Sequence, residues 1–429
     1  MLNDPKPHTG NTMNATGSTR LDFLASQVWG PAIERGEVRV SVGGEPGDGW
    51  EVREEYTVIP NARNAQLLIP SSRKAAVRSL HDYAGLRSPR TRLARRALGA
   101  AVAAGVPISL DRLIVSAPPS GPVTMVPAVG QVVGQPDAVA ALGVRTGANA
   151  KPTLELRTSQ GESIGFAKLA WNTVTTHAIE NEARALSAVH RRTNPAIRVP
   201  HVLAEGVVHE RRYVMTEPLP RSIADVPASW DSLRHDEAIG PGAVCGWRPL
   251  SSTQQSSHHA QVLDAATTVT PRALAAEARE LLGKVLSHAE ALPIADYCHG
   301  DFVPWNVGRD ANGALWLFDW ETAQQDVPAG LDTLHWFSNT QGSQAPETAV
   351  QRLIAASARA EGILRSLGYS RTGTNIVKAW YALTLVTSEI RLAEALQSWE
   401  RVKHPASVLA QFLQWGMSSV NSSSEEEHP

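Results

Sequence analysis

The sequence predicts an α+β protein in which a small antiparallel sheet with one helix is followed by a larger helical lobe, and an extra N-terminal α+β unit precedes both. Three observations predict this order. Hairpin-like apolar runs lie between residues 153 and 216, helical periodicity dominates after residue 271, and a mixed stretch of strands and helices comes first. A chain of 429 residues also exceeds one average domain, so two or three folding units are expected.

Composition and periodicity divide the chain into five segments. They are a disordered leader at 1–20, an accessory α+β unit of unknown role at 21–118, a sheet lobe at 119–219, a helical lobe at 220–415 and a disordered tail at 416–429.

The accessory unit is predicted to hold two strands and then two helices. The strands cover 51–60 and 65–70, the first helix runs from an N-cap at Ser71 or Ser72 to about residue 83, and the second covers about 89–104. Basic residues gather on the helices: Arg73, Lys74, Arg78, Arg87, Arg90, Arg92, Arg95 and Arg96. Because the cluster is discontinuous and lacks interleaved aromatic residues, we interpret it as a solvated helix face; a docking surface for an anionic partner is the alternative.

The sheet lobe is predicted to contain two hairpins that flank one helix. The first hairpin pairs 153–157 with 164–169, the helix covers about 175–190, and the second hairpin pairs 202–208 with 212–216. Helices follow at about 271–291, 346–367 and 374–399. The Gly-, Ser-, Gln- and His-rich stretch between Asp225 and Thr270 is interpreted as a long loop or insertion.

The composition argues against several classes of protein. A formal net charge of −2 predicts no general affinity for nucleic acid or anionic membranes. The two cysteines, Cys245 and Cys298, cannot form a disulfide framework, which favours a reducing compartment. The first twenty residues lack the apolar core of a secretory signal, and the longest apolar stretch, 97–110, is too short to span a bilayer. We expect a soluble, cytoplasmic protein, whose oligomeric state the sequence leaves open.

The segment 298–323, CHGDFVPWNVGRDANGALWLFDWETA, holds the residues that point to a chemistry. Residues 306–309 and 314–318 are predicted to pair as a short hairpin. Its open end brings Asn306 and Asp319 together, and Asp301 lies on the loop just before it. Each residue alone also fits a helix cap, a turn or a strand end, but the combination favours a site.

Phosphoryl transfer uses such a group of oxygen-bearing side chains. Mg²⁺ takes oxygen ligands and keeps several waters, so a carboxylate and an amide beside the phosphates of ATP suffice, and Asp319 and Asn306 fit those roles. Asp301 would accept a hydrogen bond from the acceptor hydroxyl, aim it in line with the γ-phosphate and take its proton.

In this segment the chain resembles the aminoglycoside phosphotransferase and choline kinase family, relatives of the protein kinases. That family's motif is H-G-D-x-x-x-x-N followed by D-W-E or a close variant, and here H-G-D stands at 299–301, the asparagine at 306 and D-W-E at 319–321. The resemblance covers about residues 129–397. It implies a protein kinase-like two-lobed fold, with the sheet lobe as N-lobe and the helical lobe as C-lobe, and ATP and Mg²⁺ as cofactors.

The resemblance also implies a phosphate-binding lysine paired with a glutamate on the next helix. Lys168 lies on the strand IGFAKL, and Ile179, Glu182, Leu186 and Val189 share one face of the helix that follows. A charge inside an apolar stripe needs a partner, so we expect a Lys168–Glu182 pair; a surface salt bridge is the alternative.

Further positions match the family less closely. Backbone groups of Thr216, Glu217 and Leu219 would bind the adenine as the hinge between the lobes, although Pro218 removes one donor. No G-x-G-x-x-G precedes the lysine. Asp332 resembles the aspartate that braces the catalytic loop, and a helix N-cap is the alternative.

Departures from protein kinases narrow the expected activity. Gly300 stands where protein kinases have an arginine that reads phosphate on an activation loop, and residues 321–332 leave little room for such a loop. The resemblance therefore implies an ATP-dependent small-molecule kinase. An aminoglycoside, a sugar, an amino sugar or an amino alcohol is equally admissible as the hydroxyl acceptor. Four carboxylates in the helical lobe are candidates for a pocket for a cationic acceptor: Glu347, Glu361, Glu389 and Glu394.

Two rival functions remain. One is a catalytically inactive nucleotide-binding or regulatory protein, and the other is a protein-modifying kinase. Inactive relatives are expected to lose Asp301, Asn306, Asp319 or Lys168, and all four are present, which favours an enzyme. The sequence does not decide between ATP and GTP, and it does not predict antibiotic resistance.

Overall fold

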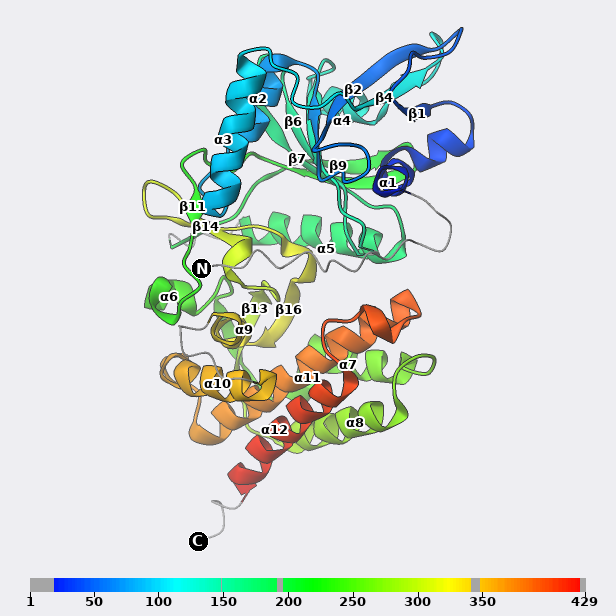
Figure 1. Cartoon of the computed structure of the whole chain (residues 1–429). Helices are drawn as coiled ribbons and strands as arrows, with labels where there is room; N and C mark the ends of the chain where they lie inside the picture. The colour runs from blue at the N-terminus through cyan, green and yellow to red at the C-terminus, as the bar shows by residue number, and fades with distance from the viewer. Residues whose placement is uncertain (1–18, 148, 191–195, 341–347, 425–429) are drawn as a thin grey trace. The chain divides into compact units, whose positions relative to one another are not determined.

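The computed structural model describes residues 19–147, 149–190, 196–340 and 348–424 (Figure 1). The chain forms two compact units. The first comprises the described residues of 1–190 with 199–225 and 309–313, and the second comprises the described residues of 191–198, 226–308 and 314–429. Both units combine helices with strands, so the predicted α+β class is confirmed.

The first unit is built on a nine-stranded sheet with the order β1-β4-β2-β3-β5-β6-β7-β10-β9, in which every neighbouring pair is antiparallel. Its elements are α1 (Arg20–Glu34), β1 (Arg39–Val42), β2 (Glu51–Ile59), β3 (Leu67–Pro70), α2 (Arg73–His81), α3 (Pro89–Ala103), β4 (Arg112–Ala117), α4 (Met125–Val132), β5 (Val139–Gly143), β6 (Thr153–Arg157), β7 (Ser163–Leu169), α5 (Thr173–His190), β9 (Val202–Val208), β10 (Arg211–Thr216) and β11 (Ala224–Asp225).

Side chains that alternate along the strands bury both faces of this sheet. Leu68 and Met215 lie in a large core with α1 and α4. Ile69, the neighbour of Leu68, packs on the other face with α2 and with side chains of α3. Val214, the neighbour of Met215, packs on α5. The sheet therefore separates α1 and α4 from the α2–α3 pair and α5 (Figure 1).

The predicted division between residues 118 and 119 does not separate two compact units. The sheet continues across it, because β3 pairs with β5 through Leu67↔Gly143 and Leu68↔Leu142. One hydrophobic core also holds residues from both sides, from Leu21 to Met215. The segment 21–118 is thus half of a larger sheet unit, because its strands pair with strands beyond the predicted boundary.

The basic cluster on α2 and α3 is mostly exposed, as the solvated-face interpretation expects. Two of its members depart from that picture. Burial lowers the pKa of Arg95 to about 10 and also lowers the pKa of Arg87, with Glu155 opposing the shift in each case. These two arginines therefore lie partly inside the unit rather than on a fully solvated face.

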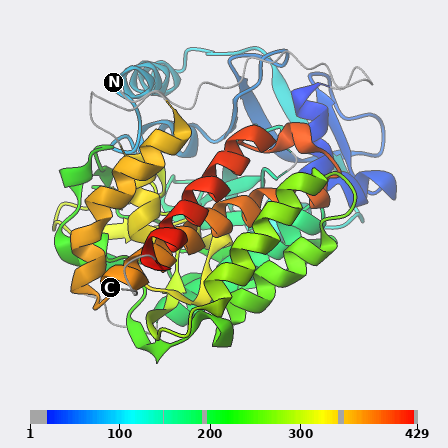
Figure 2. The same cartoon turned by 90° about the horizontal axis from the view of Figure 1, so that it is seen from below.

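The second unit is mainly helical. Its elements are β8 (Ile197–Arg198), α6 (His235–Ala238), β12 (Val244–Arg248), α7 (Gln254–Ala265), α8 (Arg272–Ser287), β13 (Leu292–Cys298), β14 (Val307–Arg309), β15 (Leu315–Leu317), β16 (Gln324–Pro328), α9 (Leu331–Asn339), α10 (Ala349–Ser366), α11 (Arg371–Leu396) and α12 (Ala406–Ser424). The long helices α8, α11 and α12 lie against one another, as the view in Figure 2 shows. Two small sheets complete the unit: β12-β13-β16, and β14 and β15 with β8.

Two sequence predictions about this unit were wrong. The stretch 225–270 is not one long loop, because it contains α6, β12 and α7. Helix α7 forms although it is polar, since Thr253 caps it and the buried Gln255 and His259 bond to side chains of α11. The tail is also helical as far as Ser424. Val420 in this segment is 3% exposed, and residues 425–429 lie outside the described part.

Within the described residues, none of the helices combines the length and the apolar character that crossing a membrane requires.

Candidate active site

The loop at 299–301 directly follows β13, the central strand of the β12-β13-β16 sheet. Asp332, in the first turn of α9, accepts hydrogen bonds from the backbone N–H groups of His299 at 2.7 Å and Gly300 at 3.0 Å. Asp332 is 3% exposed, and burial raises its pKa although these bonds oppose the shift. The N-cap of α9 is Gly330, so Asp332 braces the loop and is not the helix cap.

The glycine of the H-G-D motif is required by backbone geometry. Gly300 has a φ of 80°, which other residues rarely adopt. A Cβ at this position would lie 2.3 Å from the carbonyl oxygen of Thr322. The hydroxyl of Thr322 in turn donates to the carbonyl of His299 at 3.1 Å. The loop is therefore packed directly on the turn that follows β15, and the arginine that protein kinases have here does not fit this backbone.

His299 has a structural role, as the sequence analysis interpreted it. Its ring Nδ1 accepts the backbone N–H of Asp301 at 3.3 Å, so Nε2 carries the hydrogen and donates to the carbonyl of Phe318 at 3.1 Å. The ring also meets Trp320 edge-on, with 4.8 Å between the ring centroids. Both residues are fully buried.

The hairpin predicted from the sequence forms. Strands β14 and β15 are neighbours in one sheet, and the turn between them closes with a hydrogen bond from Gly313 N–H to the carbonyl of Asp310 at 3.0 Å. At the open end, the backbone N–H of Phe318 donates to the carbonyl of Asn306 at 3.1 Å. Asn306 thus lies opposite the residue just before Asp319.

Asp301 and Asn306 touch directly. The side-chain amide of Asn306 donates to Oδ2 of Asp301 at 2.8 Å and to its backbone carbonyl at 3.0 Å. Because the amide nitrogen faces Asp301, the amide oxygen, which is the atom that can bind a cation, lies on the other side. Asn306 is 4% exposed, whereas the side chain of Asp301 is 40% exposed.

The environment of Asp301 favours its ionised form. Burial alone would raise the pKa of this carboxyl. The hydrogen bond from His335, the electrostatic interactions with His335 and His299 and the hydrogen bond from Asn306 together outweigh burial and lower the pKa. A carboxylate held ionised and partly exposed is suited to accept a proton from a bound hydroxyl.

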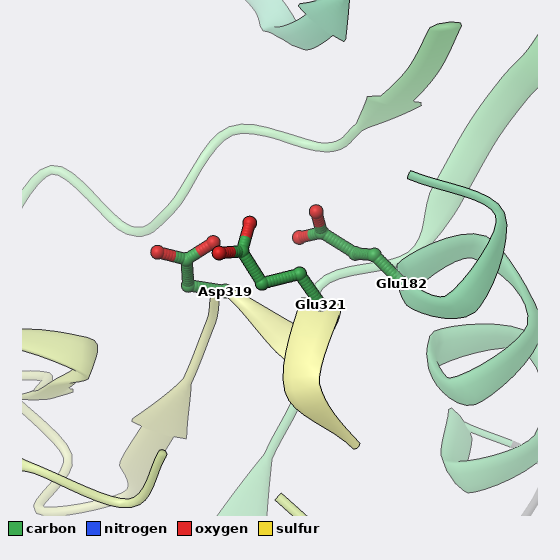
Figure 3. Close-up of side chains that lie close together, drawn as sticks. All are labelled: Glu182, Asp319 and Glu321. Atoms are coloured by element: carbon green, nitrogen blue, oxygen red, sulfur yellow. The ribbon is translucent and has the colours of Figure 1, made fainter. Parts of the chain in front are cut away.

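Asp319 and Glu321 present a pair of carboxylates. Asp319 has a φ of 72°, in the left-handed region that aspartate adopts more readily than most residues. Figure 3 shows that its side chain and that of Glu321 lie side by side, and a carboxylate oxygen of each lies within 4.8 Å of the other. Such an oxygen-only donor set suits a hard cation such as Mg²⁺.

The predicted lysine–glutamate pair is present in the first unit. Nζ of Lys168 on β7 lies 2.7 Å from both carboxylate oxygens of Glu182 on α5. The side chains are 18% and 2% exposed, so this is a buried pair, not the alternative surface salt bridge. Glu180 faces elsewhere and pairs with Arg212 at 3.1 Å.

The predicted hinge begins at Thr216, the last residue of β10, in the same unit. The backbone N–H of Glu217 donates to the carbonyl of His201 at 2.9 Å, and its carboxylate accepts the N–H of His201 at 3.0 Å. This amide is therefore already bonded to His201, the residue before β9, and Pro218 has no N–H. Adenine recognition through Thr216, Glu217 and Leu219 stays a prediction, in which the donor cannot be the amide of Glu217.

The candidate carboxylates for a cationic acceptor are largely engaged within the fold. Glu394 accepts the backbone N–H groups of Thr268 and Thr270 at 3.3 and 3.0 Å. Glu389 accepts the N–H of Lys403 at 3.1 Å, and Glu361 pairs with Arg365 one helical turn away. Glu347 lies outside the described residues.

Sequence reasoning missed two residues near Asp301. Nε2 of His335 on α9 lies 3.2 Å from Oδ1 of Asp301, and Nδ1 of His335 lies 2.9 Å from the hydroxyl of Tyr381 on α11. One signal was available: Leu331, Leu334 and His335 occupy helix positions 0, +3 and +4, which places the histidine on the buried side of α9.

No protein-family model matches the chain, and no curated protein matches it. Among solved structures, the chain is similar to the choline kinase LicA from Streptococcus pneumoniae. The identity is 12%, the match covers 69% of this chain and 98% of the other, and the TM-score is 0.43.

Proposed function

We propose that the protein is an ATP- and Mg²⁺-dependent phosphotransferase that moves the γ-phosphate to a hydroxyl group of a small molecule. One observation carries the proposal: Asp301 and Asn306 are in direct contact, and Asn306 is bonded through its backbone to Phe318, the residue before Asp319. The three residues of the motif are therefore joined within one unit.

Asp301 acts as the base in this proposal. Its carboxylate accepts the proton of the acceptor hydroxyl while the hydroxyl oxygen forms a bond to the γ-phosphorus. The bond from that phosphorus to the oxygen bridging to the β-phosphate breaks, and the electron pair leaves on ADP. Because the transition state of phosphoryl transfer is loose, most of the effect of Asp301 comes from orienting the hydroxyl.

Asn306 and Asp319 would hold Mg²⁺, and Glu321 is close enough to Asp319 to contribute a further oxygen ligand. When bound, the ion neutralises negative charge that develops on the phosphate oxygens. The orientation of the Asn306 amide supports this assignment, because its nitrogen is already committed to Asp301.

Lys168 contacts the phosphates of ATP, and Glu182 holds it in place. Both carboxylate oxygens of Glu182 lie 2.7 Å from Nζ, which restrains a side chain that otherwise has several rotamers.

A small-molecule acceptor is favoured over a protein. The chain between the D-W-E motif and α9 is filled by the short strand β16, whose residues 324–328 pair with β13. This leaves little room for the activation loop with which protein kinases bind peptides. Aminoglycosides, sugars, amino sugars and amino alcohols remain admissible.

An acceptor screen tests the proposal. ADP release from Mg·ATP would be measured without an acceptor and with one acceptor at a time: kanamycin, glucose, glucosamine or choline. The wild type and Asp301→Asn would be compared. We expect at least one acceptor class to raise ADP release above the rate without acceptor, and the variant to lose this increase. Binding of Mg·ATP with no increase for any class would favour the nucleotide-binding alternative, and phosphate on added casein would favour a protein kinase.

A further inference from the structure

A chain of hydrogen bonds leads from Asp301 into the helices of the second unit. His335 lies between Asp301 and Tyr381, at 3.2 Å from the first and 2.9 Å from the second. The Tyr381 hydroxyl lies 3.3 Å from the hydroxyl of Ser338, which donates to the carbonyl of Leu334 at 2.5 Å.

The fold has buried these polar groups together. Tyr381 is 2% exposed and the side chain of His335 is 14% exposed. Burying a hydroxyl and an imidazole without partners is costly, so their contacts define where each ring lies. His335 and Ser338 lie three residues apart on α9 and therefore share a face, and α11 brings Tyr381 to both.

The number of hydrogens decides which nitrogen of His335 is protonated. Tyr381 has one hydroxyl hydrogen, which it donates either to Nδ1 of His335 or to Ser338. If it donates to Nδ1, the neutral ring carries its hydrogen on Nε2. If Tyr381 donates to Ser338 instead, its oxygen accepts a hydrogen from Nδ1 of His335. A His335 ring that carries hydrogens on both nitrogens then also has Nε2–H.

The remaining form of His335 has a hydrogen on Nδ1 only. It would direct the Nε2 lone pair at the carboxylate of Asp301, so the geometry disfavours it as long as that carboxylate is ionised. Both favoured forms therefore donate Nε2–H to Asp301, and Tyr381 can support either form by rotating one hydroxyl.

Asp301 is consequently held at both oxygens. Asn306 donates to Oδ2 and His335 donates to Oδ1. Two donors from different elements fix the rotation of the carboxylate about its bond to Cβ, which a single donor leaves free. Among the described residues, the titratable groups that interact with His335 are Asp301, Tyr381 and Asp332.

We propose that His335 is a positioning residue that sets the orientation of Asp301 for proton transfer, with Tyr381 holding its Nε2-protonated form. The proposal rests on the proposed function, in which Asp301 receives the proton of the acceptor. It predicts that loss of the N–H donor at His335 lowers kcat and leaves the affinity for Mg·ATP nearly unchanged, because the histidine acts only through Asp301.

Three substitutions separate the contacts. His335→Gln keeps an N–H donor at the position of Nε2, whereas His335→Asn is shorter and loses the donor to Asp301. Tyr381→Phe removes only the hydroxyl. The readout is ADP formation from Mg·ATP, either in water or with the acceptor that the screen identifies. We expect His335→Asn to lower kcat about 10- to 100-fold and His335→Gln to stay within about threefold of the wild type. Thermal unfolding of each variant identifies losses caused by misfolding.

A double-variant cycle separates this proposal from the proposed function. If His335 acts through Asp301, then His335→Asn should have almost no further effect in a protein that already carries Asp301→Asn. A large loss with Asp301→Asn and a wild-type kcat with His335→Asn would overturn the positioning role and leave the proposed function intact. An unchanged rate with Asp301→Asn would instead overturn the proposed function.

A spectroscopic measurement does not depend on turnover. Long-range ¹H–¹⁵N spectra of the protein with ¹⁵N-labelled histidine distinguish the two tautomers, and His335→Gln identifies the signals of His335 by their loss. We expect a protonated Nε2 at neutral pH in the wild type. A hydrogen on Nδ1 alone would contradict the proposal, whatever the activity assays give.

Discussion

Asp332 accepts the backbone N–H of His299 at 2.7 Å, and this bond fixes the loop that presents Asp301. The second oxygen of the same carboxylate accepts the N–H of Gly300 at 3.0 Å. One buried side chain therefore satisfies two consecutive backbone groups in a segment that belongs to neither a helix nor a strand.

Asp332→Asn should destabilise the second unit. The amide has one oxygen, so one of the two backbone N–H groups faces an NH₂ group instead of an acceptor. We expect the free energy of unfolding to fall by roughly 1–3 kcal/mol, measured by urea denaturation. Asp236→Asn, which changes a side chain that is 62% exposed, is the matched control and should cost less than about 0.5 kcal/mol. Equal effects of the two substitutions would contradict the bracing role.

Lys168→Met should abolish most ADP formation. The substitution removes the cation assigned to the phosphates and leaves Glu182, which is 2% exposed, without that partner. Arg212→Met is the control, because Arg212 on β10 forms a partly exposed pair with Glu180, which lies on the same helix as Glu182. ADP release with the acceptor found in the screen should be retained in the control. Retained activity in Lys168→Met would show that the lysine does not contribute to the site.

Arg157→Met should destabilise the first unit strongly. Arg157 is fully buried and lies 2.9 Å from Asp82, which comes from the part of the chain before residue 118. Removing one partner of a buried ion pair costs about 3–5 kcal/mol. Arg112→Met, which breaks an exposed pair with Glu55, should cost about 1 kcal/mol or less. Urea denaturation of both variants measures these losses in the free energy of unfolding. Similar losses for Arg157→Met and Arg112→Met would argue against one continuous unit.

The free energy of unfolding of the second unit should depend on pH through the titration of His259. Burial, with a smaller contribution from the charge of His258, lowers the pKa of His259 to about 3 from an ordinary value of 6.5. Below about pH 6.5 the unfolded chain binds a proton that the native state does not, so the free energy of unfolding falls as the pH falls through the window from about 6.5 to 3. Between pH 7.5 and 5.5 this loss amounts to about 1.4 kcal/mol.

His259→Gln should remove that part of the pH dependence, because glutamine does not titrate. Urea denaturation of the wild type and the variant at the two pH values checks this. His288→Gln, at the C-terminal end of α8, is the control and should keep the wild-type loss. An unchanged pH dependence in His259→Gln would show that the histidine is not the group responsible.

Much of the local structure was predictable because it depends on neighbouring residues. The strands at 51–59, 153–157 and 202–208 follow their alternating pattern, and the turn before β15 follows from its Asn-Gly sequence. The contacts of Lys168 with Glu182 and of Asn306 with Asp301 also agree with the sequence analysis. Lys168 and Glu182 lie on a strand and a helix that the local pattern predicts, and Asp301 lies only five residues before Asn306.

The parts that were not predicted depend on partners that are distant in the sequence. The pairing of β3 with β5 decides that residues 21–118 belong to the larger sheet, and no local pattern encodes which strands pair. Helix α7 was missed because its polar residues suggest a loop. Gln255 and His259 are buried there only because Trp380 and Thr387 on α11 supply hydrogen bonds. His335 was missed for the same reason, since its partner Tyr381 lies 46 residues away.

The central claim is that Asp301 transfers the proton whereas Asp319 holds the metal–nucleotide complex. The affinity for Mg·ATP and the rate of ADP formation, measured on the same samples of the wild type, Asp301→Asn and Asp319→Ala, test this claim. We expect Asp301→Asn to bind Mg·ATP within about twofold of the wild type and to turn over roughly 10²- to 10⁴-fold more slowly, and Asp319→Ala to lose Mg²⁺-dependent nucleotide binding. Wild-type turnover by Asp301→Asn would contradict the account.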